Sequence, residues 1–475
     1  MVNLGVDVGG TGCKCVAFSE DGRQLAAAYE EYPLKPGAAW LSPQVLTDSV
    51  FRVIRQCAAV VQEVAAITVS SFGESFVPLD KDGVPLTDIM LYYADGTNEA
   101  FDTLVRTVGE EPFVRIAKLV PQTTYSLAQM LRTKDADKFL FVAGYLAWRL
   151  SGVMATDPSL AGRSLLYDVE HGCWSDSLVE ACGFHKTQLP ELRPAGSVLG
   201  TLLPSVARAL GLPETVQVVL GVHDQIAAAL GSGVRQAGEA VDTSGTCECL
   251  TPMFSHIPGE EFTRSNFACV AYPGGYVTYA YNISAGSVVR WYRDTFGQSY
   301  SRMNETCTKE PTGLIFLPFL QGMGGTPDVD PKATGVWIGL TTETSMPQMY
   351  RAVLEGITYE LRYNMELLAR SGVQIRKLYA AGGGARSAAW LQIKADILGC
   401  PVIPVCSEET GAMGSAMLGF SAVTGTDPGK LAEQFCRYAA PVVPKEEHRQ
   451  QYEIYYKDYV NYRKLFYGKE TSCRS

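Results

Sequence analysis

The sequence lacks any apolar run long enough to cross a membrane. The longest apolar stretch, residues 139–148, ends at Arg149, short of the roughly 18–20 residues that a bilayer span needs. The N-terminus also lacks a basic segment followed by an apolar one, and Asp7 interrupts the place where a signal peptide would carry its apolar core. We therefore expect a soluble, cytoplasmic protein with no membrane partner.

An excess of basic residues is absent too. Lysine and arginine number 40 against 50 aspartate and glutamate residues, which gives a formal net charge of −10. Non-specific binding of nucleic acid needs a basic face that displaces counterions from phosphates, so nucleic acid is not an expected partner. A nucleotide ligand remains compatible with this charge, because one local site can hold phosphates. A monomer and a homodimer both stay open.

The 13 cysteines lack the spacing of a disulfide framework or of Cys-x₂-Cys zinc sites. Only Cys13 with Cys15 and Cys247 with Cys249 are close in sequence. Both pairs fall in predicted strands, where alternating cysteines share one face and typically act as small apolar side chains. We expect reduced thiols, and a thiol-based metal or redox role is the least favoured alternative.

The length of 475 residues, 47% of them hydrophobic, allows two to four domains that each bury a core. Hydrophobic periodicity predicts strands and helices that alternate along the whole chain, an α/β architecture. The predicted strands are residues 2–8, 13–18, 66–71, 216–221, 378–381 and 402–405. The predicted helices are residues 44–62, 125–132, 139–150, 225–231, 285–296, 347–370, 388–398 and 445–466.

The strand–turn–strand unit at residues 6–15 recurs at residues 241–249. With one residue deleted, a valine, an aspartate, a glycine, a threonine and both cysteines appear in the same order. This repeat indicates two homologous halves, which we predict as domains 1–237 and 238–475. No low-complexity linker separates them, so we expect the two domains to pack closely around a central cleft.

Each of these units contains a glycine-rich turn, at residues 9–12 and 243–246. Glycine permits positive φ and lets backbone N–H groups approach an anion closely. Thr11 and Lys14 add a hydroxyl and a cation. A tight hairpin that needs glycine for geometry alone is the alternative for either turn, but two related turns favour a clamp on a polyphosphate. Neither turn is a Walker loop or a dinucleotide-binding turn.

A third glycine-rich segment, residues 381–387, lies between a predicted strand and a predicted helix. Bare backbone before a helix N-terminus suits a planar or anionic ligand. An ordinary strand-to-helix connection with Ser387 as the N-cap is an equally good interpretation.

Acidic residues follow two of the predicted strands. Asp224 stands at the carboxyl end of its strand, where open α/β sheets bind ligands, and it can be a general base, a metal ligand or the N-cap of the next helix. Glu74 ends another strand, and Asp95 comes shortly after, beside Tyr93. Carboxylates next to aromatic rings suit the hydroxyls of a polyol, which need acceptors and an apolar wall.

In this order, these motifs resemble the FGGY family of carbohydrate kinases, within the actin/Hsp70/sugar-kinase superfamily, and above all its xylulokinase-like members. The resemblance covers essentially the whole chain. It is most specific in residues 381–402 (AGGGARSAAWLQIKADILGCPV) and 334–361, and it extends to residues 4–14, 174–200 and 221–231.

The resemblance implies two ribonuclease-H-like domains that close on ATP, Mg²⁺ and a sugar or polyol. Asp224 matches the family's catalytic base, which also contacts the substrate, and Asp7 matches the residue that orients Mg²⁺. Glu74 and Asp95 match substrate-hydroxyl contacts. The matched cofactor-binding positions are Thr11, Lys14, Gly245 and Thr246 at the phosphates, Gly286 and Arg290 in the nucleotide site, and Gly383, Gly384 and Ser387 at adenosine.

The expected activity is ATP-dependent phosphorylation of a primary hydroxyl of a small sugar, with a pentulose such as xylulose as the leading acceptor. Glu74 departs from xylulokinases, which have histidine there, and resembles glycerol kinases. Glycerol, a tetritol or a deoxyketose is therefore the alternative acceptor. A non-catalytic sugar or nucleotide sensor is the alternative of another class, and it would have no need to keep Asp224.

Overall fold

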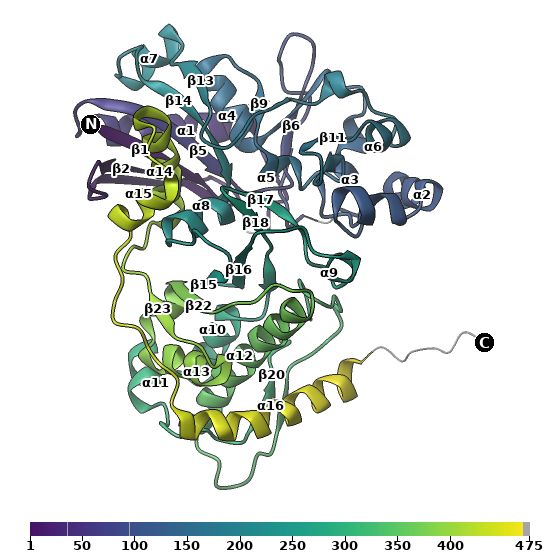
Figure 1. Cartoon of the computed structure of the whole chain (residues 1–475), viewed down its shortest axis with the longest axis vertical. Helices are drawn as coiled ribbons and strands as arrows, with labels where there is room; N and C mark the ends of the chain where they lie inside the picture. Colours follow the sequence, from purple (N-terminus) through teal and green to yellow (C-terminus); the bar gives the residue numbers. More distant parts are fainter. Residues whose placement is uncertain (36, 95, 469–475) are drawn as a thin grey trace.

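The computed structural model describes residues 1–35, 37–94 and 96–468, which form two domains that are each built on a β-sheet (Figure 1). The first sheet has the strand order β13-β14-β5-β1-β2-β3. Strand β1 pairs antiparallel with β2 and parallel with β5, which in turn pairs parallel with β14. Its strands are β1 (Val2–Val8), β2 (Gly12–Ser19), β3 (Gln24–Glu31), β5 (Val64–Ser71), β13 (Val198–Thr201) and β14 (Gln217–His223).

The second sheet repeats this arrangement. Its order is β17-β18-β16-β15-β22-β23, with β19 also paired to β16. Strand β15 pairs antiparallel with β16 and parallel with β22, as β1 does with β2 and β5. The strands are β15 (Glu239–Ser244), β16 (Glu248–Phe254), β17 (Val270–Tyr272), β18 (Gly275–Val277), β19 (Ala280–Asn282), β22 (Lys377–Gly382) and β23 (Val402–Pro404). The shared topology supports two related halves.

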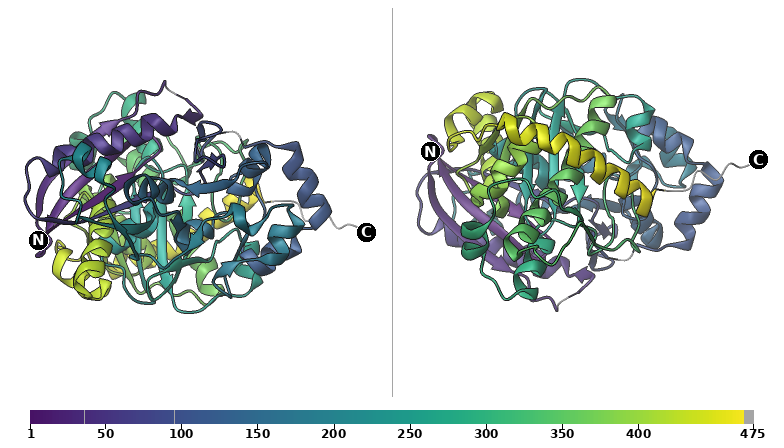
Figure 2. Two further views of the ribbon diagram at one scale, coloured as in Figure 1. Left: turned by 90° about the horizontal axis from the view of Figure 1, so that it is seen from above. Right: turned by 90° about the horizontal axis from the view of Figure 1, so that it is seen from below.

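Helices cover both sheets. The first domain contains α1 (Pro43–Ala58), α2 (Glu99–Val108), α4 (Val142–Ser151), α7 (Pro204–Leu210), α8 (Asp224–Gly231) and the shorter α3 (Ser126–Met130), α5 (Pro158–Ala161) and α6 (Asp176–Ala181). The later part of the chain forms α9 (Glu260–Arg264), α10 (Gly286–Thr295), α11 (Tyr300–Thr306), α12 (Met346–Arg370), α13 (Ala388–Leu398), α14 (Thr410–Thr424), α15 (Pro428–Phe435) and α16 (Glu446–Tyr467). Helix α16 runs along the underside of the second domain (Figure 2).

Helices α14 and α15 come late in the chain but lie beside the first sheet (Figure 1). A Cβ added to Gly5 of β1 would sit 1.9 Å from the Ala412 carbonyl oxygen of α14. A Cβ on Gly414 of α14 would sit 1.8 Å from the Ala227 carbonyl oxygen of α8. Backbones this close require glycine, and the packing carries Glu409 to the N-terminal hairpin. The domain boundary at residue 237 stays a prediction. Helices α14 and α15 follow that boundary in the chain but pack on the sheet of the first domain.

The predicted helix over residues 139–150 is wrong at its start. Residues up to 141 belong to strand β8 (Lys138–Phe141), which pairs antiparallel with β6 (Phe76–Leu79) before α4 begins. An apolar run of this kind shows no periodicity that separates a buried strand from a buried helix. The pairing with β6, distant in sequence, decides the outcome.

No helix among residues 1–35, 37–94 and 96–468 is both long and apolar enough to span a membrane. The expected cytoplasmic location and the state of assembly stay predictions.

Candidate active site

The first glycine-rich turn brings an acid, a cation and a hydroxyl together at the end of β1. Asp7 lies directly opposite Lys14 in the antiparallel pair, and Thr11 is exposed in the turn between the strands. The Lys14 ammonium pairs with Glu409, just before α14, at 2.7 Å. The hairpin tip therefore exposes backbone and a hydroxyl, while its lysine already has a carboxylate partner.

The pKa of Asp7 is raised to about 7. Burial is the largest cause, repulsion from the Asp224 and Glu409 carboxylates adds to it, and Lys14 opposes it. Three carboxylates that repel one another in this way favour a cation beside Asp7.

Asp224 is the first residue of α8, immediately after β14. His223, not Asp224, occupies the N-cap position, so the N-cap interpretation of Asp224 is wrong. The Gln225 N–H donates to Asp224 Oδ1 (2.6 Å), and His223 Nδ1 lies 2.9 Å from the same oxygen. The Asp224 side chain is 25% exposed, so its carboxylate is held by two partners yet stays accessible.

Glu74 lies in the loop after β5 in a left-handed backbone conformation, with φ of 63°. Its buried carboxylate accepts from the Arg163 guanidinium at 2.5 Å, and the Ser126 hydroxyl donates to its carbonyl oxygen at 2.7 Å. The Arg163 guanidinium carbon lies 4.9 Å from the centre of the Tyr125 ring. A non-glycine residue held at positive φ by several contacts is typical of a functional loop.

Two tyrosines form an aromatic wall near these carboxylates. The rings of Tyr92 and Tyr93 meet edge to face, with centres 5.2 Å apart. Burial first, then the charges of Asp224 and Glu74, raise the pKa of Tyr92, so its phenol is within electrostatic reach of both acids. The predicted contact Asp95 lies outside the described residues.

The second glycine-rich turn is in contact with α10, as the nucleotide-site prediction requires. A Cβ on Gly286 would sit 2.0 Å from the Gly245 carbonyl oxygen, so only glycine fits between helix and turn. The Ser287 N–H donates to the Thr246 carbonyl oxygen (2.9 Å), and the Arg290 guanidinium donates to the Thr246 hydroxyl (3.4 Å).

The third glycine-rich segment packs against the same turn. Gly383 begins a short 3₁₀ turn after β22, and a Cβ on Gly384 would sit 2.6 Å from the Ser244 Cβ. Ser387 is the N-cap of α13: its hydroxyl accepts from the Trp390 N–H (3.2 Å) and donates to Asn304 (2.7 Å). The structure thus brings all the predicted nucleotide residues of the second half to one place.

A buried ionic cluster supports this second turn, and the sequence pattern did not suggest it. Lys394 of α13 pairs with Asp242 and, at 2.8 Å, with Glu248, and it donates to the Ser244 hydroxyl at 2.7 Å. All three charged side chains are at most 2% exposed. Burial is the largest cause that raises the pKa of Glu248 to about 7.

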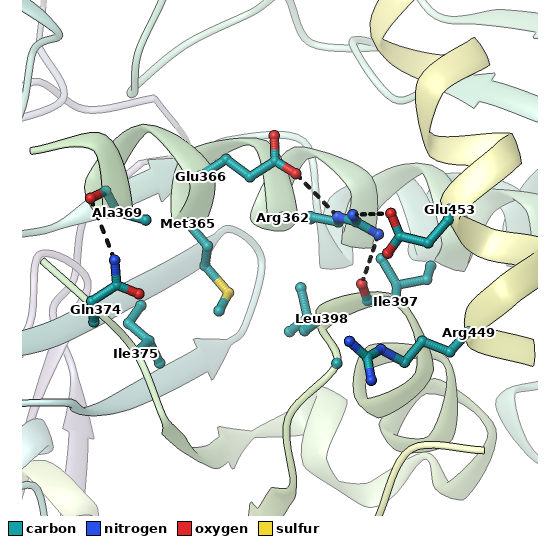
Figure 3. Close-up of a pocket in the computed structure, with 11 residues that line it drawn as sticks. Arg362, Met365, Glu366, Ala369, Gln374, Ile375, Ile397, Leu398, Arg449 and Glu453 are labelled. Carbon is teal, nitrogen blue, oxygen red and sulfur yellow. Dashed lines mark hydrogen bonds and ion pairs between the residues drawn. The ribbon is translucent and has the colours of Figure 1, made fainter. Parts of the chain in front are cut away.

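The cavity shown in Figure 3 lies away from these residues. It has a volume of about 230 Å³ and is lined by residues of α12, the end of α13 and α16. Arg362 pairs there with Glu366 and Glu453 and donates to the Ile397 carbonyl oxygen. None of the predicted site residues lines it, and its charged groups are already paired, so we place the active site at the hairpins.

Models of one protein family match both halves of the chain. The model of the FGGY family of carbohydrate kinases, N-terminal domain, matches residues 2–231, and that of the C-terminal domain matches residues 242–423. The chain belongs to the FGGY family of carbohydrate kinases.

Relatives cover this FGGY kinase almost end to end. A xylulose kinase of Bacillus subtilis is 27% identical over 96% of both chains. A glycerol kinase of Carboxydothermus hydrogenoformans is 29% identical over 88% of this chain and 89% of its own. The crystal structure of a xylulose kinase from Lactobacillus acidophilus has a TM-score of 0.89 at 22% identity, over 98% of both chains. The fold is that of two ribonuclease-H-like domains, and the chain is an ATP-dependent carbohydrate kinase.

The thiols fit a kinase better than a redox protein. Cys13 and Cys249 are buried, and burial raises the pKa of each thiol to about 12. Such thiols stay protonated at neutral pH and are poor nucleophiles and ligands. Within the part of the chain that the structure describes, no three histidine, cysteine or acidic side chains are placed to hold a metal ion.

Several residues at this FGGY site were missed from the sequence. Arg163 and Glu409 lie outside the three glycine-rich segments, and Lys394 lies in the helix that follows the third; each meets its partner only through tertiary packing. The single available signal was at His223, directly before Asp224, and the usual role of a lone histidine is structural.

Proposed function

We propose that this FGGY kinase transfers the terminal phosphoryl group of ATP to a primary hydroxyl of a pentulose, with xylulose as the first candidate. The Bacillus subtilis relative carries that substrate in its name and aligns with 96% of this chain. The site residues are assigned below on their chemistry and position.

The observation that carries the proposal is the placement of Asp224. Its carboxylate stands at the carboxyl end of β14 and is partly exposed. A carboxylate in that position can accept the proton of an attacking hydroxyl as general base. The hydrogen bond from the Gln225 N–H and the neighbouring His223 ring hold it in one orientation.

The rest of the reaction needs positioning and charge neutralisation more than covalent chemistry. Thr11 and Lys14 in the first turn, and Gly245 and Thr246 in the second, would contact the phosphates. Gly286 and Arg290 in α10, with Gly383, Gly384 and Ser387 before α13, would hold the nucleotide. For Lys14 to reach a phosphate, it exchanges its present partner, Glu409.

Mg²⁺ fits the residues present beside the first turn. This ion binds through one or two carboxylates together with waters and substrate phosphates, so it does not need a complete protein cage. Asp7 offers such a carboxylate; burial first, and then repulsion from Asp224 and Glu409, raises its pKa, and a cation would oppose both effects. When bound, the ion would neutralise charge on the transferred phosphoryl group; Asp7 would hold it.

Glycerol is the second candidate acceptor. Glu74, which would bind a substrate hydroxyl together with Asp95, is buried and already paired with Arg163. The relative with 29% identity is named glycerol kinase. One panel of acceptors separates the two candidates.

The test is an ADP-release assay with xylulose, other ketoses, glycerol and tetritols. We expect xylulose to give the highest kcat/KM and Asp224→Asn to lower kcat at least about 10³-fold, while ATP binding measured by calorimetry changes little. The matched control is Asp176→Asn, which changes an exposed first-turn aspartate of α6 in the same domain.

Three results would contradict the proposal. No acceptor raising ADP release above the background ATPase rate would favour a sensor. An active Asp224→Asn enzyme would remove Asp224 from the role of base, and a preference for glycerol would replace the pentulose.

A further inference from the structure

Tyr279 brings a side chain of the second domain into the sugar site of the first. It lies between β18 and β19, yet its ring stacks on His223, with ring centres 5.0 Å apart and planes at 27°. The Arg163 guanidinium carbon lies 5.5 Å from the centre of the same ring. Tyr279 therefore contacts His223, which precedes the proposed base Asp224, and Arg163, which pairs with Glu74.

The Tyr279 phenol is influenced by the charged groups of the proposed sugar site. Burial raises its pKa well above the usual range; Arg163 lowers it, and the Asp224 and Glu74 carboxylates raise it. The phenol thus lies within electrostatic reach of both acids that are proposed to handle the substrate.

The Tyr279 hydroxyl is buried and has no hydrogen-bond partner among the described residues, and the same holds for Gln225 Oε1 on α8. A buried hydroxyl without a partner costs free energy, so such groups are normally satisfied by a ligand or by water. Two of them, on opposite domains and close to Asp224, suit a ligand rich in hydroxyls.

We propose that Tyr279 is a substrate-recognition residue, whose hydroxyl hydrogen-bonds a hydroxyl of the sugar while its ring holds His223 and Arg163 in place. The assignment rests on the proposed function and deepens it, because a residue of the second domain then hydrogen-bonds the acceptor that is bound by the first domain. Sugar affinity would depend on how the two domains are apposed.

The test compares Tyr279→Phe with the matched control Tyr276→Phe, a tyrosine of β18 shortly before it in the chain. Tyr276 stacks on Phe254 with ring centres 6.3 Å apart, and its charged neighbour is Glu170 rather than the site acids. We expect Tyr279→Phe to raise KM for xylulose about tenfold or more and to leave KM for ATP within about twofold. Tyr276→Phe should change neither constant.

A second measurement identifies the contacted hydroxyl. Deoxy analogues of the acceptor, each lacking one hydroxyl, are compared on wild type and Tyr279→Phe. For the analogue that lacks the contacted hydroxyl, KM should be higher than for the full acceptor in wild type, but the two KM values should be similar in the variant. An unchanged sugar KM, or parallel changes in the sugar and ATP constants, would overturn the role of Tyr279. Wild type without activity on any acceptor would instead count against the proposed function, so the two failures are distinguishable.

Discussion

In the first hairpin, Asp7 lies opposite Lys14 and one residue from the end of its strand; in the second, Asp242 lies opposite Leu250 and two residues from the end. The sequence repeat aligns the two aspartates, but the turns differ by one residue. Asp242 therefore shares a strand face with Ser244 and lies beside Glu248, whereas Asp7 shares its face with Lys14.

The lysines associated with the two hairpins, Lys14 and Lys394, therefore differ in exposure and in partners. Lys14 is about one third exposed and pairs with Glu409; we propose that it exchanges this partner for a phosphate. Lys394 is buried between two carboxylates and connects α13 to both strands of the second hairpin. In this proposal, the charges of the first turn bind a ligand and those of the second support the fold.

The largest effect on stability is expected from Lys394→Met. The change leaves Asp242 and Glu248 buried without their cation, so we expect it to lower the free energy of unfolding by about 3–5 kcal/mol. Urea unfolding measures the effect. The triple variant that adds Asp242→Asn and Glu248→Gln should recover part of the loss; no loss in Lys394→Met would remove the supporting role.

A smaller effect is expected from Gly384→Ala, because its Cβ would overlap Ser244 at 2.6 Å. We expect a loss of about 1–3 kcal/mol of stability and a raised KM for ATP. The matched control is Gly383→Ala, whose nearest contact would be an ordinary 3.8 Å. Equal stability of the two variants would show that the second turn can move away from the added Cβ without a loss in the free energy of unfolding.

The pH dependence of stability tests the buried cluster. Glu248 has an ordinary pKa of 4.5 when unfolded and about 7 when folded, so the folded state binds more protons between these values. Stability should therefore fall as pH rises from about 4.5 to 7, by about 1–3 kcal/mol from this group. Glu248→Gln should flatten that part of the curve in thermal unfolding, and an unchanged slope would contradict the assignment.

The smallest change in stability is expected from Lys14→Met. A partly exposed ion pair contributes about 0–1 kcal/mol, so unfolding should be nearly unaffected. Catalysis should suffer, with kcat/KM for ATP lowered about tenfold or more, because a cation at the phosphates is lost. A variant that is destabilised but catalytically normal would reverse the comparison between Lys14 and Lys394.

The alternating α/β pattern, the two hairpins with their turns and the strand end that carries Asp224 could all be predicted from the amino-acid sequence. These features are local: glycine at a turn and an acid after a buried strand are visible in a short window. The spans of α13 and β1 agree with the periodicity residue for residue.

The contacts between side chains that are distant in sequence depend on the tertiary structure and could not be predicted from local sequence patterns. Lys14 and Glu409 are 395 residues apart, and their pairing depends on α14 packing on the first sheet through Gly5 and Gly414. The contacts of Tyr279 with His223 and Arg163 cross between domains. Such pairings follow from register and packing, which no local pattern encodes, and they distinguish the partly exposed Lys14, which we propose to bind phosphate, from the buried Lys394.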